Sequence, residues 1–176
     1  MRFSLTYPLL HHPAPPELFG GSAVAEVARA AEAAGFDALA FTEHPMPSDR
    51  WLNAGGHDAL DPFIALTWAA AATERLRLLT NITVVAYRNP FLLAKTVATL
   101  DALSEGRVIL GAAAGYLKSE FRALGVDFDE RNELFDEALD ALIAVWTGDD
   151  VTLEGRHFNA RGVTAHPRPV SVPHPP

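Results

Sequence analysis

Short runs rich in β-branched and apolar residues alternate along this chain with longer segments that repeat apolar residues at helical spacing. Such alternation is the pattern of βα units, in which parallel strands are joined by right-handed helical crossovers. Four units can be traced, and their predicted strands cover residues 3–7, 36–42, 76–85 and 107–110. The sequence therefore predicts an α/β protein with a parallel sheet.

Local signals delimit the helices between these strands. Asp61-Pro62 and Asn89-Pro90 each place a capping side chain directly before a proline, which has no N–H to leave unpaired in a first helical turn. Glycine is typical after a last turn. The expected helices run from about Ser22 to the residue before Gly35, over 62–73, over about 91–103, and, after a break around Gly125, over about 129–146. The Ala-rich helix over 62–73 is expected to be buried on more than one side.

The pattern changes after Gly148. Residues 151–158 indicate a small hairpin around Glu154-Gly155. Five of the thirteen prolines fall within 166–176, a composition typical of extended backbone with little structure of its own. We expect one domain over 1–165, followed by a Pro-rich tail, 166–176.

The length of the chain limits the architecture. A closed (β/α)8 barrel takes about 250 residues, and this chain has 176. Four βα units with parallel strands form either half of such a TIM-type barrel or a small open sheet. Both arrangements leave strand edges unpaired, so self-association is expected.

Composition excludes several partners. The chain carries 22 acidic and 14 basic residues and a formal net charge of −8, without a basic cluster that would bind nucleic acid or an anionic membrane. No apolar run approaches the roughly 20 residues that span a bilayer, and the N-terminal segment lacks the features of a signal peptide. The absence of cysteine suits the cytosol. We expect a soluble, cytoplasmic protein.

Candidate chemistry lies in the loops that follow the strands, since ligands of parallel α/β sheets bind beyond the carboxyl ends. Glu43-His44 follows the second strand, and an imidazole there can pass a proton to or from a substrate. The alternative is a histidine bonded to a backbone carbonyl. The small residues from Gly111 to Gly115 follow the fourth strand and either admit a phosphate or flat ring or pack a helix on the sheet.

Other chemistries find no support in the sequence. Seven histidines show no H-E-x-x-H or paired ligand spacing, so no metal site is predicted. No G-x-S-x-G elbow is present, and hydrolysis through a serine nucleophile is not indicated.

Taken together, the motifs resemble the luciferase-like monooxygenase superfamily, and most closely the N-terminal half of its F420-dependent oxidoreductase branch. The resemblance extends from Met1 to about Pro169. It implies that the tail over 166–176 leads to a fifth strand that is absent from this sequence. The segments that carry it are Ala31 to Asp37, Thr42-Glu-His-Pro45, Asp61-Pro62, Ala86-Tyr-Arg-Asn-Pro90, Ala94-Lys95, Thr99 to Arg107, Gly111 to Tyr116, and Glu120-Phe-Arg-Ala-Leu-Gly125.

The resemblance implies a TIM-barrel redox enzyme in which a flavin or deazaflavin ring lies over the strand ends. Coenzyme F420 is the expected cofactor, with FMN as the alternative. His44 is implied as the acid or base beside the ring, and Glu43 as the residue that orients His44 or bonds to the ring's polar edge. A non-proline cis peptide is expected between Asn81 and Ile82, behind the ring. The implied lining residues are His44, Asn81, Ile82, Ala112, Ala113, Gly115 and Tyr116.

The expected function is that of an oxidoreductase or monooxygenase that transfers a hydride to or from a small organic substrate. The alternative is a non-catalytic or truncated half-barrel that binds flavin weakly or acts as an assembly subunit. By the same resemblance, the helices over 62–73 and 91–103 are expected to form the interface of a homodimer.

Overall fold

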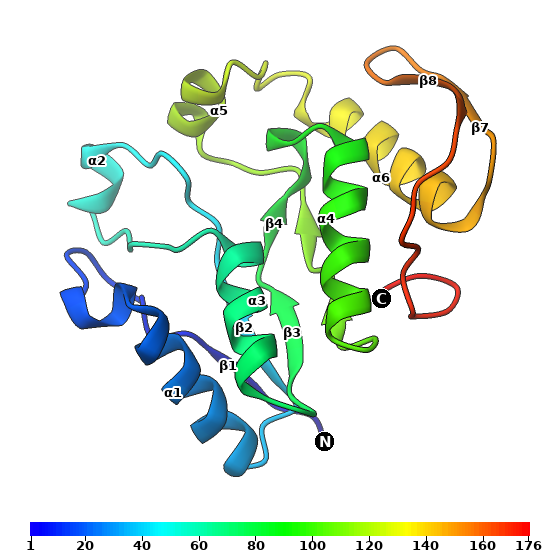
Figure 1. The fold of residues 1–176 in the computed structure, drawn as a ribbon. Coiled ribbons are helices and arrows are strands. Elements are labelled where there is room, and N and C mark those ends of the chain that lie inside the picture. The colour runs from blue at the N-terminus through cyan, green and yellow to red at the C-terminus, as the bar shows by residue number, and fades with distance from the viewer.

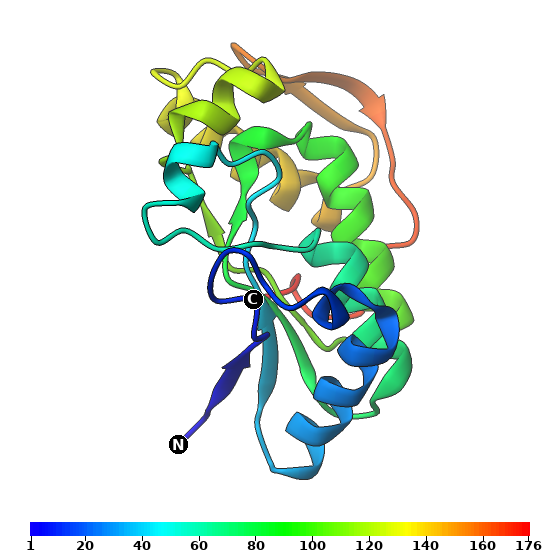
Figure 2. The same cartoon turned by 90° about the vertical axis from the view of Figure 1, so that its left-hand side faces the viewer.

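The computed structural model describes all residues from 1 to 176. Its main sheet has four parallel strands in the order β1-β2-β3-β5. Helices α1, α3 and α4 lie along the same side of this sheet (Figures 1 and 2). The predicted α/β class and parallel sheet are confirmed. The four strands are β1 (Ser4–Thr6), β2 (Ala38–Phe41), β3 (Arg77–Thr80) and β5 (Val108–Ile109).

The expected helix boundaries are confirmed at their N-termini. The Asp61 carboxylate accepts hydrogen bonds from the N–H groups of Phe63 and Ile64, both at 3.0 Å. The Asn89 side chain accepts from the N–H of Phe91 at 3.0 Å in the same way. The long helices are α1 (Gly21–Ala33), α3 (Pro62–Ala72), α4 (Pro90–Leu103) and α6 (Arg131–Thr147); the short ones are η1 (Pro16–Phe19), α2 (Asp49–Leu52), η2 (Val85–Tyr87) and α5 (Lys118–Leu124).

The hydrophobic core lies between the main sheet and its helices. Leu39, Leu78 and Val108 occupy one register across three strands, and each is fully buried. Leu79 and Ile109 follow them in the next register and are only half-buried. Because consecutive strand residues point to opposite faces, the second face of the sheet is the one without helices. This layering is that of half a barrel.

The third predicted strand, 76–85, is not continuous. It divides into β3 and β4 (Thr83–Val84), and β4 pairs with β6 (Ala112–Ala113) outside the main sheet. The Asn81–Ile82 peptide bond at the division is cis, as expected from the resemblance. The division carries the chain from the main sheet to the region above its strand ends.

Helix α3 is buried along one broad face and exposed along the opposite one. Phe63 and Leu66 pack into the core, whereas Ile64 is 71% exposed and Trp68 is 55% exposed. The expectation of burial on more than one side therefore needs a correction, since one apolar strip of α3 faces solvent.

The C-terminal hairpin is longer than predicted. β7 (Val151–Glu154) pairs antiparallel with β8 (Asn159–Val163), so the hairpin extends beyond residue 158. The Glu137 carboxylate of α6 accepts from the N–H groups of His157 and Phe158 in the connecting loop. This contact lies 20 residues away along the chain, which is why a local pattern around Glu154-Gly155 did not reveal it.

The tail over 166–176 contains no strand or helix, but a buried carboxylate holds it. Asp101 of α4 is fully buried and accepts from the N–H groups of Val170 and Ser171 at 2.8 and 2.9 Å. Its other oxygen accepts from the Ser171 hydroxyl at 3.0 Å. The tail is therefore packed on the domain through α4.

The variant Asp101→Asn is expected to lower the free energy of unfolding by about 2 kcal/mol, because in either orientation its NH2 would face a backbone N–H that loses its acceptor, that of Val108 or those of Val170 and Ser171. Urea unfolding followed by circular dichroism measures the change. The matched control is Asp149→Asn, because the exposed Asp149 carboxylate pairs with Arg168 at 2.5 Å near the same tail and surface pairs contribute about 0–1 kcal/mol. Equal effects of the two substitutions would contradict a structural role for Asp101.

No helix in the structure combines the length and the apolar composition needed to cross a membrane.

Candidate functional site

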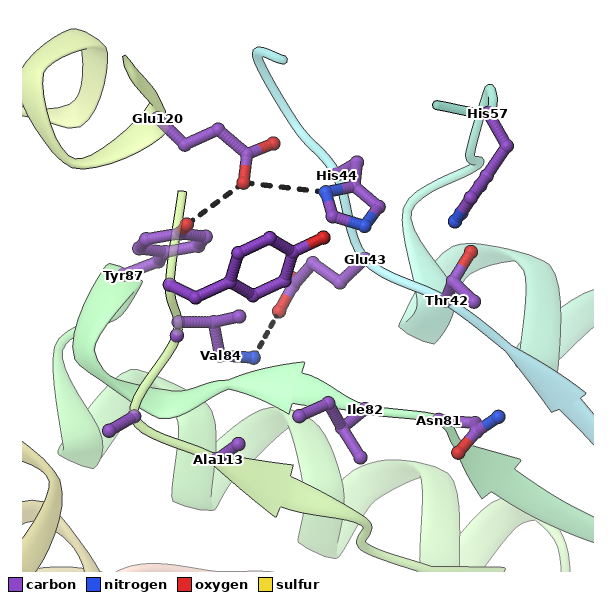
Figure 3. Close-up of a pocket in the computed structure, with 13 residues that line it drawn as sticks. Thr42, Glu43, His44, His57, Asn81, Ile82, Val84, Tyr87, Ala113 and Glu120 are labelled. Carbon is purple, nitrogen blue, oxygen red and sulfur yellow. Dashed lines mark hydrogen bonds and ion pairs between the residues drawn. The ribbon is translucent and has the colours of Figure 1, made fainter. Parts of the chain in front are cut away.

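A cavity of about 470 Å³ opens above the strand ends, at the edge of the sheet where the sequence places the candidate chemistry. Its walls come from the loop after β2, from β4 and η2, and from the segment that runs from β6 into α5 (Figure 3). Thirteen residues line it, and the size falls within the range of small-molecule sites, roughly 300–1,000 Å³.

The cavity brings together seven of the eight residues named from the sequence. Those that line it are Glu43, His44, Asn81, Ile82, Ala113, Gly115 and Tyr116. Ala112 is placed differently, since it packs against the hydrophobic core instead of lining the cavity. The two alanines are consecutive residues of β6, and consecutive strand residues point to opposite faces. Only Ala113 faces the cavity.

Close backbone packing lies next to Asn81 and Ile82, which line the cavity. The Gly111 carbonyl accepts from the Thr80 hydroxyl and from the Thr83 N–H, both at 2.8 Å. A Cβ at Gly111 would lie 2.1 Å from the Thr80 carbonyl oxygen, so the two strand ends approach more closely than any other residue allows. The cis peptide lies directly after this contact.

One wall of the cavity is formed by small residues, which leave room for a flat group to lie against it. Ala113, Ala114 and Gly115 line this wall in sequence. Gly115 has a φ of 86°, and a Cβ there would lie 2.5 Å from the Val84 side chain. The glycine is therefore required by its backbone conformation and by its neighbour, and the wall lacks large side chains that would fill the space.

His44 stands at the mouth of the cavity with its imidazole nearly buried. The side chain is 11% exposed, and its ring centroid lies 4.4 Å from that of Trp51 and 4.9 Å from that of His57. Its Nδ1 lies 3.5 Å from a carboxylate oxygen of Glu120. The second ring nitrogen is on the far side of the ring from Glu120 (Figure 3).

Glu43 is directed at the protein interior, away from the His44 ring. One carboxylate oxygen accepts from the Val84 N–H at 2.6 Å, and the other pairs with Arg88 at 2.6 Å. Arg88 also pairs with Asp61 at 2.9 Å. Because neighbouring residues in extended backbone point in opposite directions, the carboxylate that faces His44 belongs to Glu120 and not to Glu43.

Burial controls the charge of Glu43. Loss of water raises the pKa of its carboxyl to about 7, although Arg88 and the Val84 N–H both favour the ionised form. The carboxyl therefore titrates near neutrality at the wall of the cavity. Groups with shifted pKa values gather at functional sites.

The variant Glu43→Gln is expected to flatten the pH dependence of stability. In the folded protein the pKa of Glu43 is about 7, above its ordinary value of 4.5, so between these values the folded state holds a proton that the unfolded state releases. Stability therefore falls as the pH rises through this window, by about 3 kcal/mol for this group. Glutamine has no such proton, so the variant should lose less stability than the wild type between pH 4 and pH 8.

Chemical denaturation at several pH values measures this difference. The control Glu17→Gln changes an exposed glutamate of η1 and should keep the wild-type pH dependence. An unchanged slope in Glu43→Gln would show that folding does not raise the pKa of Glu43.

Sequence reasoning missed four polar residues that line the cavity, namely Thr42, His57, Tyr87 and Glu120. Tyr87 donates a hydrogen bond to Glu120 at 2.9 Å, and Glu120 faces His44. Tyr87 and Glu120 lie within two of the segments that carry the family resemblance, Ala86 to Pro90 and Glu120 to Gly125. Their presence in those segments was the available signal, but it assigned them no role.

Comparison with known proteins adds to this geometry. A family model described as luciferase-like monooxygenase matches residues 1–176. A protein of Beutenbergia cavernae named F420-dependent glucose-6-phosphate dehydrogenase is 39% identical over 151 residues, which cover 81% of this chain and 43% of that protein. The chain spans about half the length of the curated relatives it matches.

Solved structures share the fold. The monooxygenase RslO1 from Streptomyces bottropensis has a TM-score of 0.87 and 31% identity, over 99% of this chain and 52% of that one. An F420-dependent secondary alcohol dehydrogenase, solved with an F420-acetone adduct, has a TM-score of 0.78 and 24% identity, over 96% and 49% of the two chains. Both matches agree with the half-barrel seen here.

Proposed function

Because this chain belongs to the luciferase-like monooxygenase family, we propose that its cavity binds a deazaflavin or flavin ring and supports an oxidoreductase reaction. Coenzyme F420 is the first candidate, since a relative of 39% identity is named for its dependence on F420. FMN is the alternative. When bound, such a ring supplies the hydride chemistry, and the protein supplies position and electrostatics. The substrate is a small organic molecule.

The cavity fits such a ring. Ala113, Ala114 and Gly115 form a wall without large side chains, and the neighbouring strand ends are held together by the contact between Gly111 and Thr80. Polar side chains border the opening, among them His44 and Asn81. A flat heterocycle with polar edges matches a narrow apolar space with a few polar groups at its rim.

The observation that carries this function is the nearly buried imidazole of His44 at the mouth of the cavity. In our proposal, His44 takes or gives the proton that accompanies hydride transfer, at its Nε2 atom. Glu43 holds a second proton in the cavity wall near neutrality, because burial raises its pKa to about 7. His44 keeps the role expected of it. Glu43 was expected to orient His44 or to bond to the ring's polar edge, but its carboxylate contacts Val84 and Arg88, so the proton-carrying role in the wall is a different one.

Titration of the purified chain tests ring binding. We expect a saturable change in visible absorbance or fluorescence with F420 or FMN. The variant Ala113→Phe fills the wall and should abolish the change, whereas Ala33→Phe, at the exposed end of α1, should leave it intact. If neither F420 nor FMN produces a spectral change with the wild type, the chain has no binding site for either ring.

The alternative is a non-catalytic half-barrel that binds flavin weakly or acts as an assembly subunit. The chain spans 43% of one relative and 52% of a solved neighbour. Turnover separates the two candidates. The alternative is supported if the chain binds the ring but shows no turnover by itself, and if turnover appears when the second half of a relative is added in trans.

We also propose that the chain forms a homodimer in the cytoplasm. The exposed strip of α3 carries Ile64 and Trp68, and α4 exposes Leu92 to 70%. Exposed apolar patches of this kind mark interaction surfaces, and a two-fold dimer would bury the same strips on both copies. Solution mass by light scattering tests the dimer, and cell fractionation tests the compartment; a chain without cysteine is suited to the reducing cytosol.

A further inference from the structure

The Glu120 carboxylate is held behind His44 by two fixed hydrogen bonds. Glu120 belongs to α5 and is 1% exposed. Its Oε1 accepts from the Met46 N–H at 3.3 Å, and its Oε2 accepts from the Tyr87 hydroxyl at 2.9 Å. The same Oε2 lies 3.5 Å from Nδ1 of His44 (Figure 3). Two segments, the connection after β2 and the η2 turn, therefore meet at this one carboxylate of α5.

The Nδ1 atom of His44 has no hydrogen-bond partner of its own. It is buried, and the Glu120 oxygen is the charged group that faces it. Aromatic rings surround the rest of the imidazole, with Trp51 at 4.4 Å, His57 at 4.9 Å and Tyr116 at 6.2 Å between centroids. A carboxylate only accepts hydrogen bonds, so the ring nitrogen opposite it must carry the hydrogen. In a neutral imidazole the other nitrogen is then the acceptor.

We propose that Glu120, held by Tyr87, is a positioning residue that fixes His44 with its proton on Nδ1 and leaves Nε2 free to accept a proton from the substrate. What Nε2 does there rests on the proposed function, but the tautomer of His44 is a property of this chain alone. Similar second partners fix the tautomer of catalytic and metal-binding histidines in other proteins.

Tyr87 is suited to hold Glu120. Burial, together with the hydrogen bond to Glu120, raises the pKa of Tyr87 well above its ordinary value. The phenol therefore keeps its hydrogen and donates it to Oε2. With one lone-pair region of Oε2 taken by Tyr87, the other is left for His44.

Nitrogen NMR of the imidazole reads the tautomer directly. In the wild type, with the ring neutral, we expect the His44 signals of an Nδ1–H tautomer, assigned by their loss in His44→Gln. In Glu120→Gln, the amide oxygen should stay with the Met46 N–H, because the NH2 group would otherwise face that donor. The NH2 group then faces Nδ1, which must become the acceptor, so the major tautomer should change to Nε2–H.

Controls separate a positioning role from a general structural one. Glu26→Gln, on the exposed face of α1, should leave the tautomer unchanged. Tyr87→Phe should keep the Nδ1–H form but broaden its signal, as Glu120 becomes free to move. In turnover assays Glu120→Gln should lower kcat by about 10²-fold with little change in KM, because a misplaced proton affects the chemical step and not substrate binding.

A wild-type Nε2–H tautomer, or an unchanged tautomer in folded Glu120→Gln, would show that Glu120 lacks this role. The wild-type spectrum and the Tyr87→Phe spectrum decide the matter even if Glu120→Gln does not fold. Absence of cofactor binding by the wild type is a separate result. It would overturn the proposed oxidoreductase function and leave the tautomer of His44 as measured.

Discussion

Replacing His44 with glutamine is expected to lower turnover by about 10²–10⁴-fold, the usual contribution of a positioned acid or base. Glutamine is close to histidine in size and keeps a polar group near Glu120, but it carries no titratable proton. Ring binding should change little, since the wall of Ala113, Ala114 and Gly115 is untouched. Steady-state kinetics with the cofactor identified by titration measures the loss.

The matched control is His166→Gln, in the exposed tail, which should keep wild-type turnover. His44→Gln with turnover within a few-fold of the wild type would remove His44 from the mechanism. A larger KM with unchanged kcat would indicate that His44 binds substrate without moving a proton.

Replacing Gly111 with alanine is expected to destabilise the chain by about 4 kcal/mol or more, a large part of the total stability of a typical domain. The added Cβ would lie 2.1 Å from the Thr80 carbonyl oxygen, a backbone atom that cannot move aside as a side chain can. To remove this clash, the ends of β3 and β5 would have to separate. That movement would break the hydrogen bonds that Thr80 and Thr83 donate to the Gly111 carbonyl. Thermal and urea unfolding measure the change.

Gly35→Ala is the control for this substitution. Gly35 has a φ of 83°, but a Cβ there has nothing within 4 Å, so the variant should lose only about 1 kcal/mol for the left-handed backbone. If both variants lose the same amount, the close approach at Gly111 has no energetic importance.

The elements of the fold were predictable where short-range signals define them. Asp61-Pro62 and Asn89-Pro90 begin α3 and α4 because the caps act within three residues of themselves. The division of the third strand lay beyond such reasoning, since β4 leaves β3 in order to pair with β6, 29 residues further along. Residue periodicity could not show that partner, and only the family resemblance placed the cis peptide at the division.

The candidate site was predictable to the extent that it follows strand ends. His44 and Gly115 were found because the carboxyl ends of parallel strands meet at one edge. Glu120 was not, because its contact with His44 joins residues 76 positions apart, through a helix whose orientation the sequence does not give. The placement of Ala112 outside the cavity lining could have been predicted, since strand alternation already separates it from Ala113.

The groups around His44 come from separate connections, namely the one after β2, the η2 turn after β4, and α5 after β6. Each connection can accept insertions or exchanges of its own, while the strand ends beneath remain the same. Because the connections vary independently while the strand ends stay the same, a change in one connection can alter which substrates the cavity accepts. For engineering, the loop that carries His57 is therefore the segment to vary, and the contact between Gly111 and Thr80 should be kept unchanged.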